Sequence, residues 1–216
     1  MSDLFPLRRR CAAMLAACAL SGPLLAQPLP PEAAAAAARR TAEQVCAACH
    51  GQAGQSTQAR YPSLAGQDET YLFKQLRQFR AADGKPALRQ DATMAAVVHG
   101  MGDEEMHELA RYFSRQPHAR GQAAQPQLVE AGKAIYRQGN PASRLPACVT
   151  CHRPDGGGIP PDFPRLAGQQ PAYVVKQLHA WKAGTRGGPG KLMSLLVPLM
   201  SDEEIEAVAQ YVAQLP

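Results

Sequence analysis

The amino-acid sequence predicts an all-α protein that consists of two similar domains in tandem. The first observation is an internal repeat, in which a Cys-x-x-Cys-His motif at residues 46–50 returns 102 positions later at residues 148–152. The same register holds between YPSLAGQDETYLFKQLRQF at residues 61–79 and FPRLAGQQPAYVVKQLHAW at residues 163–181. The second observation is apolar spacing of helical period in both halves, with no alternating strand pattern of useful length. Two units of about 100 residues indicate a duplicated domain.

The first 26 residues have the composition of a secretory signal peptide. A positive segment, PLRRR, precedes an apolar run that is broken by Ser21, Gly22 and Pro23 and is too short to span a bilayer. We expect cleavage after Ala26 and export to the periplasm. The alternative is a lipoprotein signal, LAAC, which would leave a lipidated Cys18, but the apolar run continues beyond that cysteine.

The expected domains are residues 27–116 and 128–216, joined by the polar linker PHARGQAAQPQ at residues 117–127. Each domain is expected to contain three helices, the first leading towards the Cys motif. The third helix of the second domain begins with the capping box SDEE, and GDEE is its weaker counterpart in the first domain. The expected ranges are 32–47, 70–82 and a helix starting near residues 102–105, then 128–138, 172–183 and a helix starting near residues 201–204.

The net charge is too small, and too evenly spread, to indicate a nucleic-acid partner. The formal charge of +5 falls to +3 when residues 1–26 are removed, and no run of Lys or Arg remains. We therefore expect no nucleic-acid binding.

The paired Cys-x-x-Cys-His motif is the pattern by which haem c is attached covalently. Two thiols add to the two vinyl groups of the porphyrin, and the adjacent histidine becomes an axial ligand of the iron. A redox dithiol would belong beside a βαβ pattern, which is absent, and one zinc site would require the two copies to be adjacent. Disulfides are the remaining alternative in an exported protein. The predicted attachment residues are Cys46, Cys49, Cys148 and Cys151, with His50 and His152 as iron ligands.

A sulfur ligand in the sixth iron position would leave no open position for substrates. The repeat contains two methionine pairs, Met94/Met193 and Met101/Met200. Met101 and Met200 immediately precede helix caps, where a residue usually packs on the first turn of the helix. We therefore predict Met94 and Met193 as the ligands, although His99 could compete for the first iron.

Pro62 and Pro164 follow their histidines at the same distance in both halves. Each carbonyl could accept a hydrogen bond from the ring nitrogen of its histidine and so fix the tautomer. Each proline could equally serve only to end a turn, and both interpretations stay open from the sequence.

The repeated blocks, with PSLAGQ and PRLAGQ after each Cys motif and ATM and KLM before the third helices, resemble the dihaem cytochrome c4 family over nearly all of the mature chain. That resemblance implies two class I cytochrome c domains related by a pseudo-twofold axis, with the haem propionates facing each other. It also implies His50–Met94 and His152–Met193 ligation, a periplasmic location with loose membrane association, and electron transfer from a bc1-type complex or similar donor to terminal oxidases.

From its residues the chain is expected to be an electron carrier and not an enzyme, because no acid–base pair or activated nucleophile is visible. We expect a monomer that docks briefly with redox proteins. The alternatives are an electron-transfer subunit of a periplasmic oxidoreductase, a dihaem peroxidase, or a gas-binding sensor. Each of the last two needs an iron with an open position.

Overall fold

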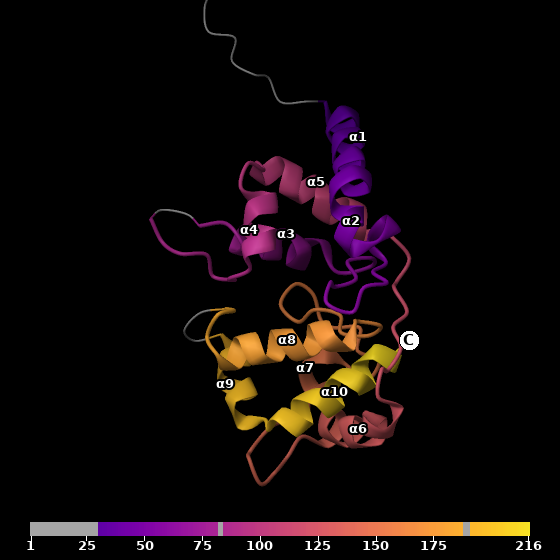
Figure 1. Ribbon diagram of the computed structural model, residues 1–216, viewed down its shortest axis with the longest axis vertical. Helices are drawn as coiled ribbons and strands as arrows, with labels where there is room; N and C mark the ends of the chain where they lie inside the picture. Colours follow the sequence, from indigo (N-terminus) through magenta and orange to yellow (C-terminus); the bar gives the residue numbers. More distant parts are fainter. Residues whose placement is uncertain (1–29, 82–83, 188–190) are drawn as a thin grey trace, which may run out of the picture.

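The computed structural model describes residues 30–81, 84–187 and 191–216, and Figure 1 shows them as two helical domains stacked along the long axis. The expected signal peptide and Cys18 lie outside the described residues. A single segment of chain joins the two domains along one side. Both domains are helical, and the described part of the chain contains isolated β-bridges but no strand. The predicted fold class is confirmed.

In the first domain the chain runs through one nearly continuous helical segment into the Cys motif. This segment consists of α1 (Pro31–Thr41), a π-helical turn (Ala42–Cys46) and α2 (Ala47–His50). A π turn accommodates one extra residue in a helix and is common at functional sites. The remaining helices are α3 (Glu69–Gln78), α4 (Ala92–Val98) and α5 (Asp103–Ser114).

The second domain repeats this order with one difference. Its helices are α6 (Val129–Gln138), α7 (Val149–His152), α8 (Pro171–Lys182), α9 (Leu192–Leu196) and α10 (Asp202–Gln214). A loop separates α6 from α7, whereas α1 leads directly into the Cys motif of the first domain. Short 3-10 turns at Pro126–Leu128 and Val197–Leu199 precede α6 and follow α9.

The predicted helices differ from the structure at the Cys motifs, at the end of α3 and at the methionine segments. The first helical segment continues to His50, three residues beyond its expected end, and the second Cys motif forms the unpredicted short helix α7. Helix α3 ends at Gln78, four residues before the expected end, because the Gln78 carbonyl accepts a hydrogen bond from the Arg89 amide and the chain turns there. The two methionine segments, which lie outside the three helices predicted for each domain, form the short helices α4 and α9. Helices of seven and five residues are too short to show a clear apolar period.

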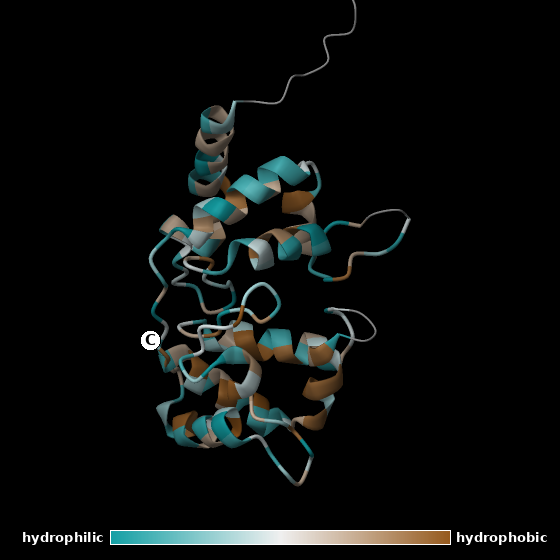
Figure 2. Cartoon of the chain, turned by 180° about the vertical axis from the view of Figure 1, so that it is seen from behind, coloured by the Kyte–Doolittle hydropathy of each residue, from teal (hydrophilic) through white to brown (hydrophobic). Residues whose placement is uncertain are grey.

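Each domain has its own apolar core, in which the third helix packs against the first and second helices. Gly132 permits a close crossing of α6 and α10, because a Cβ at this position would lie 2.0 Å from the Ala207 carbonyl oxygen. Figure 2 shows broad hydrophobic stretches on the helices of the second domain, whereas α5 is largely hydrophilic on the face seen and α1 alternates between hydrophilic and weakly hydrophobic bands. None of the described helices combines the length and the apolar character that crossing a membrane requires.

Candidate haem sites

The first Cys motif places a buried imidazole next to two thiols at the end of one helical segment. His50 ends α2, and its Nδ1 atom lies 2.9 Å from the Pro62 carbonyl oxygen. A carbonyl can only accept a hydrogen bond, so Nδ1 carries the proton in this contact. The lone pair of Nε2 is thereby left for a metal ion.

The second site has the same geometry. His152 ends α7, and its Nδ1 atom lies 3.0 Å from the Pro164 carbonyl oxygen. The hydrogen-bond interpretation of the two prolines is therefore confirmed in both domains. The chain turns away after each histidine through a residue of positive φ, Gly51 at 75° and Arg153 at 65°. The Tyr136 hydroxyl donates to the Arg153 carbonyl oxygen over 2.6 Å and stabilises the second turn.

Burial of both imidazoles favours the neutral form, which is the form that binds iron. Burial lowers the pKa of His50 and of His152, although each hydrogen bond to a proline carbonyl acts in the opposite direction. The positive charge of Arg89 also lowers the pKa of His50, and the negative charge of Asp91 acts in the opposite direction. A histidine binds a metal through a deprotonated ring nitrogen. Surroundings that lower the pKa therefore favour iron binding over the charged, protonated form.

The cysteines have the properties of attachment residues and not of a reactive dithiol. Cys46, Cys49, Cys148 and Cys151 are free thiols and partly buried. Burial raises the pKa of Cys46 and of Cys148 to about 11. A redox dithiol needs a lowered pKa, whereas a thioether carries no charge and tolerates apolar surroundings. The donor set of each motif therefore fits a haem held by two thioether bonds and one imidazole.

Both methionine pairs contact the domain cores: Met94 and Met101 pack against the same cluster in the first domain, and Met193 and Met200 share a cluster in the second. Met94 lies in the first turn of α4, where its amide donates to the Asp91 carboxylate over 3.1 Å, and its side chain is partly buried against Phe79 and Val98. Met193 lies in α9 and is likewise partly buried at the edge of its domain core. Met101 and Met200 pack in clusters with Met106 and Ile205, as expected of residues that precede a helix cap. Ligation by Met94 and Met193 stays a prediction.

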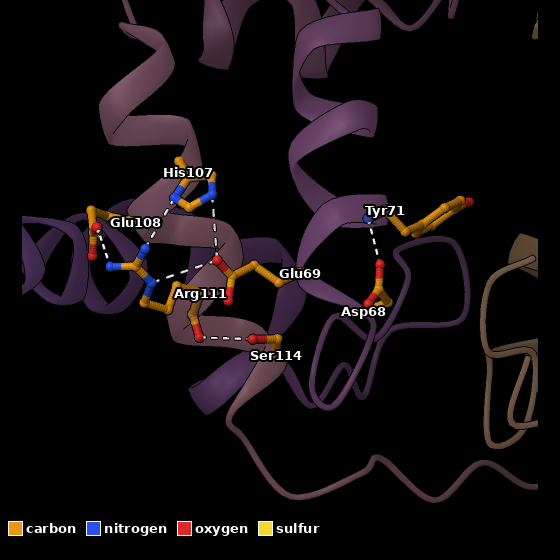
Figure 3. Close-up of polar contacts among 7 residues, drawn as sticks. All are labelled: Asp68, Glu69, Tyr71, His107, Glu108, Arg111 and Ser114. Carbon is orange, nitrogen blue, oxygen red and sulfur yellow. Dashed lines mark hydrogen bonds and ion pairs between the residues drawn. The ribbon is translucent and has the colours of Figure 1, made fainter. Parts of the chain in front are cut away.

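The other histidines lie on helix flanks or on the surface. His99 is exposed at the end of α4, and His118 is exposed in the linker. Figure 3 shows His107 within a polar network on α5, where its Nε2 lies 3.4 Å from the Glu69 carboxylate and Arg111 contacts both Glu69 and Glu108. The Asp68 carboxylate in the same figure caps α3 by accepting from the Tyr71 amide. None of these contacts resembles a haem ligand set.

Sequence reasoning missed the polar residues that join the domains. Gln67 and Gln169 each hydrogen-bond the backbone of the opposite domain, and the repeated LAGQ block could have indicated them. Arg89 and Arg186 are buried in the same interface. They lie 97 positions apart, a separation that differs from the repeat register, so aligning the halves does not pair them.

The chain is similar to known proteins over both domains. The cytochrome c family model matches residues 35–116 and again residues 129–216. Cytochrome c4 of Azotobacter vinelandii is 39% identical over 188 residues, which cover 83% of this chain and 89% of that protein. The thiosulfate dehydrogenase electron acceptor of Thiomonas intermedia (strain K12) is 36% identical and covers 100% of this chain and 95% of its own length.

A solved structure shows the same arrangement of domains. The crystal structure of reduced recombinant cytochrome c4 from Pseudomonas stutzeri matches with a TM-score of 0.76 at 34% identity, and the match covers 84% of this chain and 98% of that one. Two matches to the family model, in register with two Cys-x-x-Cys-His motifs, imply one covalently bound haem c in each domain. The chain therefore belongs to the cytochrome c family, as a dihaem member of the cytochrome c4 group.

Proposed function

We propose that this protein is a periplasmic carrier that takes one electron at each of two haems, with His50 and Met94 on the first iron and His152 and Met193 on the second. The haem supplies the Fe(II)/Fe(III) couple when bound. The chain buries the two sites, fixes the histidine tautomers and closes the sixth positions. We propose a bc1-type complex or a similar respiratory donor, and terminal oxidases as acceptors.

One observation carries the proposal: both histidine anchors lie next to the contacts that join the domains. Pro62 accepts from His50, and the amide of the following residue, Ser63, donates to the Gln169 side chain over 2.8 Å. Pro164 accepts from His152, and the amide of Arg165 donates to the Gln67 side chain over 3.0 Å. Two redox centres anchored at one interface suit a protein that exchanges electrons internally and with partners.

A second donor is favoured by one comparison. The relative from Thiomonas intermedia, named as the electron acceptor of thiosulfate dehydrogenase, matches this chain over its whole length. We therefore also propose a thiosulfate dehydrogenase as the donor, in which case the protein is the electron-transfer partner of a periplasmic oxidoreductase.

The two donors are distinguished by stopped-flow reduction of the oxidised, haem-loaded protein. One reaction contains a bc1 complex with quinol, the other thiosulfate dehydrogenase with thiosulfate, and each is compared with the same mixture lacking the enzyme. The donor is the enzyme whose mixture reduces both haems at a higher rate than the same mixture without the enzyme. Reoxidation by oxidase-containing membranes tests the acceptor, and reduction by neither enzyme would contradict both proposed donors.

The location and the mature ends are tested by fractionation and intact-mass spectrometry. We propose cleavage after Ala26, which leaves residues 27–216 plus the mass of two haems in the periplasmic fraction. A mass that corresponds to a chain starting at a lipidated Cys18 would instead place the protein on the membrane.

Limited proteolysis tests the proposed linker at residues 117–127, which should be cut before either domain.

A further inference from the structure

A basic side chain joins the end of the second helix to the start of the third helix in the first domain. Arg80 lies two positions beyond α3, and its guanidinium donates to the Met101 carbonyl oxygen over 3.0 Å. The same group donates to the carboxylate of Asp103, the first residue of α5. Because these bonds span 21 and 23 positions of the chain, they close the whole segment that carries α4 and Met94.

The second domain contains the same contact at equivalent positions. Lys182 ends α8 and lies 102 positions after Arg80, the offset that relates the two Cys motifs. Its ammonium group donates to the Met200 carbonyl oxygen over 3.0 Å and to the Asp202 carboxylate over 2.8 Å. These bonds close the segment that carries α9 and Met193. We refer to each pair of bonds, from Arg80 and from Lys182, as the clamp of its domain.

A short path of hydrogen bonds leads from each clamp to the methionine helix. The Met101 amide donates to the carbonyl oxygen of Val98, the last residue of α4, over 3.1 Å. The Met200 amide donates to the carbonyl oxygen of Val197, which directly follows α9, over 3.0 Å. Both valines are 0% exposed. Met101 and Met200 therefore connect the clamp, through their carbonyl groups, to the methionine helix, through their amides.

The carboxylates that complete the clamps are ionised in neutral solution. The hydrogen bond from Arg80 lowers the pKa of Asp103, and the hydrogen bond from Lys182 lowers the pKa of Asp202. Both carboxylates also lie in the first turn of a helix, where the positive end of the helix dipole favours a negative charge. The clamps are therefore retained through the neutral pH range.

The methionine helices depend on such contacts for their position. Helices of seven and five residues are not stable on their own, because their few internal hydrogen bonds do not offset the cost of ordering the first turn. A contact that holds the two ends of a chain segment together reduces the number of conformations open to that segment. A clamped segment therefore keeps its methionine close to one position even when a contact inside the segment breaks.

We propose that Arg80 and Lys182 are positioning residues that hold Met94 and Met193 in place for the sixth iron position of their own domain. Each clamp then determines how often that position opens. When a sulfur leaves its iron, a clamped segment returns it quickly, whereas a segment without a clamp moves further away and leaves time for another ligand. This role rests on the proposed ligation by Met94 and Met193 and not on the identity of the redox partners.

The test measures the binding of imidazole to the oxidised, haem-loaded full chain by stopped-flow absorption. Imidazole occupies an iron only after the sulfur has left it, so the binding rate reports the opening of the sixth position. Arg80→Ala and Lys182→Ala remove the clamps. Arg80→Lys and Lys182→Arg place at each position the cation that the other domain uses, and so retain the clamps.

The matched control is Arg77→Ala. Arg77 lies 3.5 Å from the same Asp103 carboxylate, whereas the Met101 carbonyl oxygen accepts from Arg80. The control therefore removes a basic side chain of similar size and leaves the clamp in place. Hydrogen–deuterium exchange of the α4 and α9 amides is recorded on the same samples, because it reports local opening of these helices independently of any added ligand.

We expect Arg80→Ala to raise the rate of one of the two kinetic phases of imidazole binding about fivefold, the effect of losing one partly exposed charged contact. Lys182→Ala should raise the rate of the other phase. Exchange should increase in α4 or in α9, whichever lies in the altered domain. The two lysine and arginine exchanges and Arg77→Ala should retain the wild-type rates.

Two further variants serve if an alanine variant does not fold. Asp103→Asn and Asp202→Asn remove the charged partner and leave the bond to the methionine carbonyl oxygen, so each should raise the rate of the same phase by a smaller factor. An asparagine variant that raises the rate of the opposite phase would contradict a clamp that acts within its own domain.

The proposal is overturned if imidazole binding and amide exchange are both unchanged in Arg80→Ala and Lys182→Ala. It is also overturned if Arg77→Ala has an equal effect, or if each alanine variant accelerates both phases, because a general loss of stability would then be the cause. Failure of the underlying ligation is seen without any variant: imidazole would bind the wild-type protein at either iron within the mixing time.

Discussion

Gln67 and Gln169 occupy equivalent positions in the two domains, and each holds the backbone of the other domain by a pair of hydrogen bonds. Gln67 donates to the Arg165 carbonyl oxygen over 2.9 Å and accepts from the Arg165 amide over 3.0 Å. Gln169 donates to the Ser63 carbonyl oxygen over 3.0 Å and accepts from the Ser63 amide over 2.8 Å. The two pairs of hydrogen bonds are equivalent, as expected for domains related by a pseudo-twofold axis.

Replacing either glutamine should weaken the docking of the domains. Gln67→Ala or Gln169→Ala removes two hydrogen bonds to the other domain and one from the amide of the next residue, Asp68 or Gln170. Each bond contributes about 1 kcal/mol net, so we expect a loss of about 3 kcal/mol. The free energy of unfolding of the haem-loaded protein checks this, with small-angle scattering to detect separated domains. Gln58→Ala is the control, because that side chain bonds the Ala48 carbonyl within one domain. Equal losses in all three variants would contradict a role in docking.

The proposed iron ligands differ from the other methionines in their spectroscopic effect. Met94→Ala and Met193→Ala should each remove the sulfur-to-iron charge-transfer band of one haem and lower its reduction potential. Met101→Leu and Met200→Leu should retain both bands, because they change only core packing and cost less than about 1.5 kcal/mol. If a band survives Met94→Ala or Met193→Ala and disappears in one of the leucine variants, the methionine replaced in that leucine variant is the iron ligand instead.

The pH dependence of stability should reveal the pair formed by Asp91 and Lys176. Burial acts to raise the pKa of Asp91, but its bonds to Lys176 and to the Met94 amide lower it below the ordinary 3.8. A lowered pKa in the folded state means stability that is present above pH 3.8 and is lost as the pH falls through the folded value. Lys176 is 59% exposed, so the pair should contribute no more than about 1 kcal/mol.

Denaturant unfolding of wild type and Asp91→Asn checks this relation, because asparagine retains the cap on the Met94 amide and loses the charge. The two proteins should differ at pH 7 and converge in acid below the lowered pKa. A difference that is constant with pH would mean that Asp91 acts only through its hydrogen bonds.

The third helices offer a matched pair of cap substitutions. Ser201 caps α10 in a complete capping box with Glu204, whereas Gly102 begins α5 without a side-chain cap. The φ angle is −75° at both positions, and a Cβ at Gly102 would meet nothing within 4 Å. Ser201→Ala should cost about 1 kcal/mol of the free energy of unfolding, and Gly102→Ser should gain a few tenths. A loss of stability in Gly102→Ser would contradict the equivalence of the two caps.

The features that the sequence predicted correctly are formed by residues that lie close together in the chain. The Cys motifs, the capping box at Ser201 and the distance from His50 to Pro62 depend on residues close in sequence. The duplication supplies the Cys motif and the His-to-Pro distance twice, whereas α5 begins at Gly102 without a side-chain cap. The boundaries of α6 and α8 followed from apolar spacing for the same reason, within one residue.

The features that sequence reasoning missed depend on contacts between distant segments. Arg89 and Arg186 lie in polar segments whose composition suggests exposure, and they become buried only because the two domains close over them. The π turn that ends at Cys46 likewise has no apolar period of its own. The helical form of the Met94 segment depends on a single cap by Asp91.

The reaction of the reduced, haem-loaded protein with carbon monoxide tests the central claim most directly. With sulfur on both irons, the account predicts no change in either haem spectrum on the timescale of mixing. Rapid formation of a carbon monoxide complex at either haem would reveal an open coordination position, and the protein would then be a ligand-binding or peroxidase-like dihaem protein and not a simple carrier.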